Sequence, residues 1–123
     1  MSYFNKRGKY GVIYADPPWS YGDPALNSVG AIRHYVQMSV DDICKMPVAE
    51  ELADKNCALF LWTTSPMLLR EAPAVMSAWG FEYKALLTWV KDRMGTGEWL
   101  RGQTEHCLLA SRGKPVFITA VRL

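Results

Sequence analysis

A nearly unbroken apolar run, CALFLWTT at residues 57–64, restricts the fold more than any other stretch of this 123-residue chain. Its apolar part is far too short to cross a bilayer. Continuous hydrophobicity without alternation is typical of a strand that is buried on both faces of a sheet. Such strands occur in α/β proteins, where helices cover the sheet. The run therefore predicts a strand at the centre of an α/β domain.

The rest of the chain alternates between strand and helix patterns. Four further strands are predicted, at residues 10–15, 83–91, 105–111 and 116–121. A first helix is predicted over residues 40–46, between a capping box (Ser39, Asp42) and Pro47. A second is predicted over residues 48–55. A third is predicted from about Pro73 to a C-terminal glycine, Gly80. Residues 20–37 and 92–104 read as long loops, the first a candidate substrate lid. This alternation favours an α/β sheet.

Helices are few for the number of strands. Four or five predicted strands face two or three predicted helices, and a buried sheet needs cover on both faces. The sequence also stops at Leu123, directly after an apolar run. We therefore expect residues 1–123 to form a single domain that is incomplete at its C-terminal end.

Composition sets broad limits. Half of the residues are hydrophobic and the net charge is +2, which is too weak to argue for a polyanionic partner. Cys44, Cys57 and Cys107 lack CxxC spacing and are expected to be small buried residues in a reducing cytosol. No metal-ligand set is visible, and the N-terminus lacks the apolar segment of a signal peptide. The expectation is a cytoplasmic protein with no membrane span and no metal.

The tetrapeptide Asp-Pro-Pro-Trp at residues 16–19 follows the first predicted strand, where open α/β sheets build their ligand sites. Each proline fixes φ and removes an N–H, so Pro17 and Pro18 hold the segment extended. The Asp16 carboxylate and the Pro17 carbonyl then form two acceptors, and Trp19 offers a face for stacking. An exocyclic amine on a nucleobase matches all three groups.

Two acceptors on the hydrogens of such an amine increase electron density on its nitrogen, which is otherwise delocalised into the ring. Methyl transfer from a sulfonium donor to adenine is the reaction that this arrangement favours. A duplex substrate has to flip its base out to reach the site. The alternative is a strand-ending turn that carries a packed indole.

The segments ADPPW, HYVQMSVDDI, LFLWTTSP, AWGFEYKALLTWVK and EHCLLASRGKP, in this order, resemble the adenine N(6)-methyltransferases of the messenger-RNA-writer type, a family with phage and bacterial DNA-modifying members. The resemblance implies a Rossmann-like methyltransferase fold with S-adenosylmethionine as donor. It implies that Asp16, Pro17, Pro18 and Trp19 are catalytic, with Asp16 also near the donor. The family's segments after the EHCL strand, which close the donor pocket, have no counterpart here.

Further residues are weighed with this resemblance. Lys91 and Glu105 are expected to bind substrate, and Tyr21 is expected to form a second wall of the base pocket. His106 is expected to be structural, and Trp62, Trp79 and Trp89 are interpreted as core packing. Four cations are candidates for phosphate contacts, namely Arg93, Arg101, Arg112 and Lys114.

The sequence therefore predicts an adenine-specific N(6)-methyltransferase that acts on nucleic acid, with DNA favoured over RNA. A catalytically silent nucleic-acid-binding subunit without a complete donor pocket is the main alternative. A weaker alternative changes the acceptor to cytosine or RNA. A homodimer or a partner subunit that completes the domain fits either reading, and the recognition sequence is left open.

Overall fold

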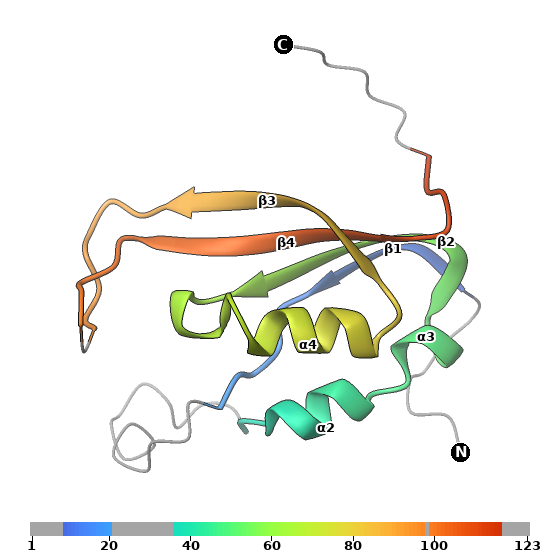
Figure 1. Cartoon of the computed structure of the whole chain (residues 1–123), viewed down its shortest axis with the longest axis horizontal. Coiled ribbons are helices and arrows are strands. Elements are labelled where there is room, and N and C mark those ends of the chain that lie inside the picture. The colour runs from blue at the N-terminus through green and yellow to red at the C-terminus, as the bar shows by residue number, and fades with distance from the viewer. Residues whose placement is uncertain (1–8, 21–35, 98, 117–123) are drawn as a thin grey trace.

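The computed structural model describes residues 9–20, 36–97 and 99–116 (Figure 1). Its elements follow one another as strands and short helices. In chain order they are β1 (Tyr10–Ala15), α2 (Val40–Lys45), α3 (Val48–Glu51), β2 (Ala53–Thr63), the 3-10 helix η2 (Ser65–Met67), α4 (Glu71–Ala78), β3 (Glu82–Val90) and β4 (Thr104–Arg112). The α/β class predicted from the sequence is confirmed.

The four strands form one mixed sheet in the order β1-β2-β4-β3. β1 and β2 are parallel, and β4 runs antiparallel to both β2 and β3. β1, β2 and β3 therefore point the same way, and their carboxyl ends share one edge with the start of β4. Ligand sites in open α/β sheets form at such an edge.

The helices lie on one side of this sheet, with α4 against β2 and β3 and with α2 packed on α4 (Figure 1). The buried core lies between them. Leu59 and Leu61 of β2 are fully buried against Ile43 and Val75. The indole N–H of Trp79 donates to the Ile43 carbonyl at 2.8 Å and ties α4 to α2.

The opposite face of the sheet is apolar and, within the described residues, carries no helix. Val12 and Tyr14 of β1 are 60% and 71% exposed, and Phe60 and Trp62 of β2 are partly exposed. β2 was expected to be buried on both faces, and this is wrong for its second face. The cause is the shortage of helices that the sequence indicates, because alternate side chains of a strand face opposite sides.

Local sequence signals set several element boundaries as predicted. The Ser39 hydroxyl accepts the Asp42 N–H at 3.1 Å, which confirms the start of α2. Gly80 ends the α4 region with φ of +84°, a conformation that favours glycine. The helix expected over residues 48–55 is shorter, because the chain enters β2 at Ala53.

The fifth strand predicted at residues 116–121 falls almost wholly outside the described residues, as does most of the first long loop. None of the helices in the described part of the chain is long and apolar enough to span a membrane.

Candidate active site

The Asp-Pro-Pro-Trp segment leaves β1 at the edge where the parallel strands end. It is fixed by backbone hydrogen bonds, since the Trp19 N–H donates to the Pro17 carbonyl and the Met38 N–H donates to the Pro18 carbonyl, both at 2.9 Å. The Pro17 carbonyl thus already has one donor. A carbonyl oxygen has two lone pairs, so it retains capacity for a second donor.

Trp19 lies largely in the core rather than at the surface. Its side chain is 6% exposed, and its indole N–H donates to the Trp62 carbonyl at 3.2 Å. The sequence interpretation treated this indole as an open stacking surface. In the structure it forms part of a cavity wall while most of its area packs against the protein.

A cavity of about 370 Å³ opens beside Asp16, within the size range of small-molecule sites. Its walls combine negative charge with aromatic surface. Two carboxylates line it, from Asp16 and Glu105, together with four aromatic side chains, from Tyr14, Trp19, Trp62 and Trp89.

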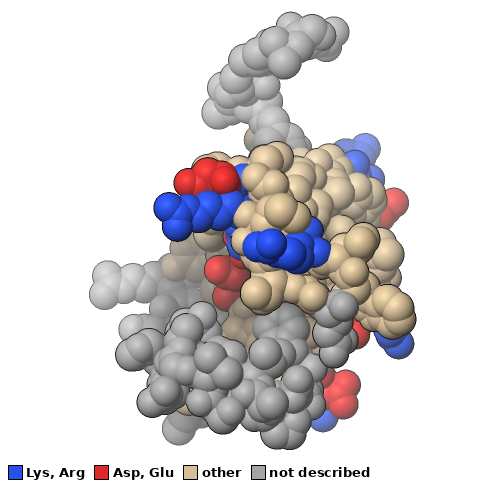
Figure 2. All heavy atoms as spheres, turned by 90° about the vertical axis from the view of Figure 1, so that its left-hand side faces the viewer, with Lys and Arg blue, Asp and Glu red and all other residues tan. Residues whose placement is uncertain are grey.

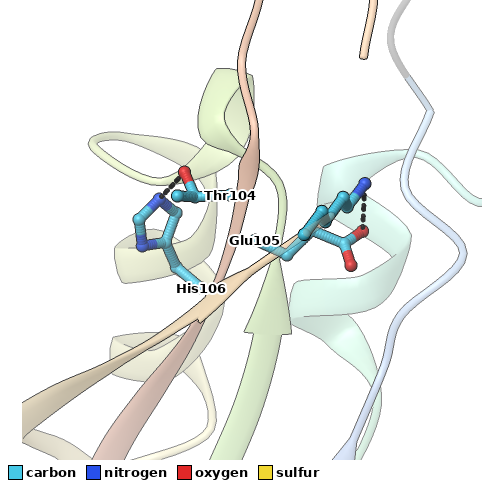
Figure 3. A network of polar contacts seen from close by, with 4 residues as sticks. Thr104, Glu105 and His106 are labelled. Atoms are coloured by element: carbon cyan, nitrogen blue, oxygen red, sulfur yellow. Dashed lines mark hydrogen bonds and ion pairs between the residues drawn. The ribbon is translucent and has the colours of Figure 1, made fainter. Parts of the chain in front are cut away.

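The carboxylate of Glu105 reaches the cavity from β4. Its Oε1 lies 3.7 Å from the Lys91 Nζ, and both side chains are about 40% exposed. Figure 3 shows Glu105 on one side of β4 and His106 on the other. The predicted substrate residues Lys91 and Glu105 are therefore together at the site edge, joined by an ion pair.

His106 is held by two hydroxyl groups. Its Nε2 lies 3.2 Å from the Thr104 hydroxyl (Figure 3). Its Nδ1 lies 3.1 Å from the Thr88 hydroxyl. The contact with Thr88 joins β3 to β4, and the contact with Thr104 lies within β4. They agree with the structural role expected for this histidine.

The cavity alters the acidity of Asp16. Loss of solvation against the cavity walls and, second, the negative charge of Glu105 raise the pKa of the Asp16 carboxyl. Asp16 as a whole residue is exposed, and it lines the cavity together with Glu105. A raised pKa in a cleft is a feature of functional carboxylates, although structural charge pairs also produce it.

Three aromatic residues of the cavity were missed as site residues. Trp62 and Trp89 were interpreted as core packing, and Tyr14 as part of a buried strand. Trp89 is 58% exposed, and it is the cross-strand partner of Glu105. The ring centroids of Tyr14 and Trp62 lie 6.4 Å apart in an edge-to-face arrangement. The sequence carried a signal only for Trp89, its proximity to Lys91.

The buried indole N–H of Trp62 has no acceptor among the described residues. An unpaired buried donor costs about 1–3 kcal/mol.

Tyr21, which was predicted to form the second wall of the base pocket, lies outside the described residues. In the described ranges no group of three or more His, Cys, Asp or Glu side chains is arranged to hold a metal ion.

Comparison with known proteins decides the family. The family model MT-A70 matches residues 10–121, nearly the whole chain. The chain belongs to the MT-A70 family. This confirms the family resemblance inferred from the sequence, and with it the Rossmann-like methyltransferase class of the fold.

Individual MT-A70 relatives include bacterial and eukaryotic proteins. The chain is 32% identical over 126 residues to the Type II methyltransferase M.MunI of Mycoplasma, with 88% of this chain and 53% of that protein aligned. It is 33% identical over 116 residues to an N(6)-adenosine-methyltransferase MT-A70-like protein of Drosophila melanogaster, covering 88% of this chain and 17% of the relative.

A third relative is named as a non-catalytic subunit. It is the N6-adenosine-methyltransferase non-catalytic subunit MTB of Arabidopsis thaliana, 28% identical over 114 residues, with 85% of this chain and 14% of the relative aligned. The chain thus spans about half the length of M.MunI and a much smaller share of the eukaryotic relatives.

Proposed function

We propose that this chain carries the adenine-binding centre of an S-adenosylmethionine-dependent N(6)-adenine methyltransferase that acts on DNA. The observation that carries the proposal is the Asp16 carboxylate at the carboxyl end of β1, with a raised pKa, in a cavity with aromatic walls. Family membership supports methyl transfer to adenine. We favour DNA because one relative, M.MunI, is a bacterial Type II methyltransferase, while the similar match to the Drosophila adenosine methyltransferase makes RNA the alternative.

The cavity suits a flat ring that bears an amine. The Asp16 carboxylate accepts one N–H of the adenine amine, and the free lone pair of the Pro17 carbonyl accepts the other. Trp89, which is more than half exposed, offers the ring a larger open face than Trp19 does. Stacking of a base on an aromatic side chain is worth about 1–3 kcal/mol.

These contacts prepare the amine nitrogen for alkylation. Acceptors on both N–H groups increase electron density on the nitrogen, from positions that are fixed before the reaction. As the new N–C bond forms, the bond between the methyl group and the donor sulfur would break with its electron pair left on sulfur, and the amine nitrogen has to lose a proton. The Asp16 carboxylate already accepts a hydrogen bond from one of these hydrogens, so it is placed to take the proton.

The donor fits the charge of the same cavity. S-adenosylmethionine, when bound, supplies a methyl group activated by a positive sulfur. Asp16 and Glu105 are close enough to influence each other electrostatically, and their nearest ion-paired cation is Lys91 at the rim. A cationic group placed near Asp16 relieves this repulsion, so Asp16 is the residue that we assign to the cationic part of the donor.

A catalytically silent subunit is the second candidate, and the match with the non-catalytic subunit MTB favours it. Calorimetric titration of the chain with S-adenosylmethionine separates the two. The enzyme predicts binding in the micromolar range that weakens in Asp16→Asn. A folded chain that binds adenine-containing DNA but no donor supports the silent subunit and contradicts the enzymatic proposal.

A further inference from the structure

The connection between β3 and β4 continues their hairpin, because hydrogen bonds join its two sides. The Lys91 N–H donates to the Gln103 carbonyl and the Gln103 side-chain amide donates to the Lys91 carbonyl, both at 2.8 Å. Further out, the Gly95 N–H donates to the Gly102 carbonyl at 2.7 Å, and the Arg101 Nε donates to the Gly95 carbonyl at 3.2 Å. We call residues 91–97 and 99–103 the finger.

The finger presents apolar side chains to solvent at its end. Trp99 is 93% exposed and Leu100 is 85% exposed. Exposed large apolar groups that gather at one place mark interaction surfaces more often than isolated ones do. A Cβ on Gly97 would collide with the Leu100 carbonyl, so the two described sides of the finger approach each other closely at this point.

Positive charge lies next to these apolar groups. Arg93 and Arg101 stand on the two sides of the finger, and neither forms an ion pair with a carboxylate among the described residues. Figure 2 looks onto this end of the molecule and shows Lys and Arg side chains in its upper part, with Asp and Glu side chains beside them. An aromatic group and arginines that have no carboxylate partner among the described residues match a nucleic-acid strand, which offers base faces and phosphates together.

The finger continues directly from the candidate active site. Trp89 and Glu105 are cross-strand partners in the β3–β4 hairpin, and both line the cavity. The finger begins two residues beyond Trp89 and projects past the carboxyl end of β2 (Figure 1). A strand whose adenine enters the cavity passes close to it.

We infer that the finger is a nucleic-acid contact, in which Trp99 stacks on an unpaired base near the acceptor adenine while Arg93 and Arg101 bind phosphates. This inference rests on the proposed function and extends it from the adenine pocket to the strand around it. It assigns a stacking role to a tryptophan that no sequence motif of the site includes. Stacking at the tip also compensates for the unpairing that base flipping requires.

The test measures the affinity of the 123-residue chain for a fluorescein-labelled, adenine-containing single-stranded DNA by anisotropy. The Trp99→Ala variant is expected to bind between about 5-fold and 150-fold more weakly. Trp99→Phe is expected to keep most of the affinity but to lose part of the tryptophan fluorescence quenching that DNA causes. The matched control is Leu69→Ala, because Leu69 is 90% exposed and lies outside the finger.

The arginines are tested through salt dependence. Arg93→Gln and Arg101→Gln are each expected to reduce the slope of log K against log salt by about 0.7, the value for one single-strand phosphate contact. Arg70→Gln is the control, because its side chain is 89% exposed and distant in sequence from the finger.

Three results overturn the inference. If Trp99→Ala binds DNA as tightly as the wild type, the finger contact is wrong and the adenine pocket is unaffected. If Trp99→Ala instead changes the sedimentation coefficient from that of an oligomer to that of a monomer, with DNA affinity unchanged, the tip binds protein. If the wild-type chain binds no DNA, both this inference and the proposed substrate are wrong.

Discussion

Asp16, directly after β1, and Glu105, on β4, line one cavity although β2 lies between these two strands in the sheet. Burial against the cavity walls and then the charge of Glu105 raise the pKa of Asp16. Substitutions of Asp16 and Glu105 are therefore expected to change the pH dependence of both methyl transfer and stability.

Asp16→Asn is expected to reduce methyl transfer by about 100- to 1000-fold, the usual effect of removing one preorganised polar group from an active site. The same change is expected to increase stability near neutral pH. The folded-state pKa is raised, so the folded protein binds the proton more tightly than the unfolded chain does, and stability falls as pH rises above 3.8 through the raised value. Asparagine removes that loss.

Thermal unfolding of wild type and Asp16→Asn between pH 3 and pH 8 measures this effect. The two midpoints are expected to diverge as pH rises, with the variant higher. Asp92→Asn, a carboxylate on the exposed β3–β4 connection, serves as the control. Equal pH dependence in wild type and Asp16→Asn would show that the carboxyl is not perturbed.

Glu105→Gln is expected to shift the pKa of Asp16 downward, because it removes the second cause of the increase. The acidic limb of the pH–rate profile then moves to lower pH, since activity requires an ionised Asp16. Stability is expected to change by less than about 1 kcal/mol, because the Lys91–Glu105 pair is exposed. If the acidic limb of the pH–rate profile does not move in Glu105→Gln, Glu105 does not affect the pKa of Asp16.

Trp19 and Trp89 are expected to differ in function, with Trp19 needed for stability and Trp89 for substrate binding. Trp19→Ala removes a buried core residue and is expected to lower the free energy of unfolding by about 3–5 kcal/mol in a urea titration. Trp89→Ala, at an exposed position, is expected to weaken binding of the adenine substrate with little loss of stability. Trp89→Phe should restore binding, and unchanged binding in Trp89→Ala would remove this residue from the base site.

Gly97→Ala tests whether the shape of the finger matters for DNA binding. A Cβ at Gly97 collides with the backbone of Leu100, so the tip has to rearrange. We expect weaker DNA binding with the unfolding midpoint unchanged. Gly102→Ala is the matched control, since a Cβ there meets no atom within 4 Å. Equal affinity in the two variants would argue against a preformed tip.

Local signals in the sequence predicted the elements well, because their causes are local. The capping hydroxyl of Ser39 and the left-handed Gly80 act within a few residues of themselves. The position of Asp16 at a strand end was equally visible, since β1 stops at the residue before it.

The sequence did not predict which of the aromatic side chains are buried and which are exposed. Trp19 is buried in the core, and its indole N–H donates to the Trp62 carbonyl, a contact between segments far apart in the sequence. Trp89 is exposed because β4 lies between β2 and β3, so β3 is an edge strand opposite Glu105. Strand order and register decide which face a residue occupies, and a periodicity cannot encode them. The roles of Asp16, Pro17, Pro18 and Trp19 stay predictions.

The most direct test of the central claim is nucleoside analysis by mass spectrometry after the chain is incubated with S-adenosylmethionine and adenine-containing DNA. We predict N(6)-methyldeoxyadenosine with the wild type and a loss of at least about 100-fold with Asp16→Asn. No methylated adenine with the folded wild-type chain, or equal product with Asp16→Asn, would contradict the account.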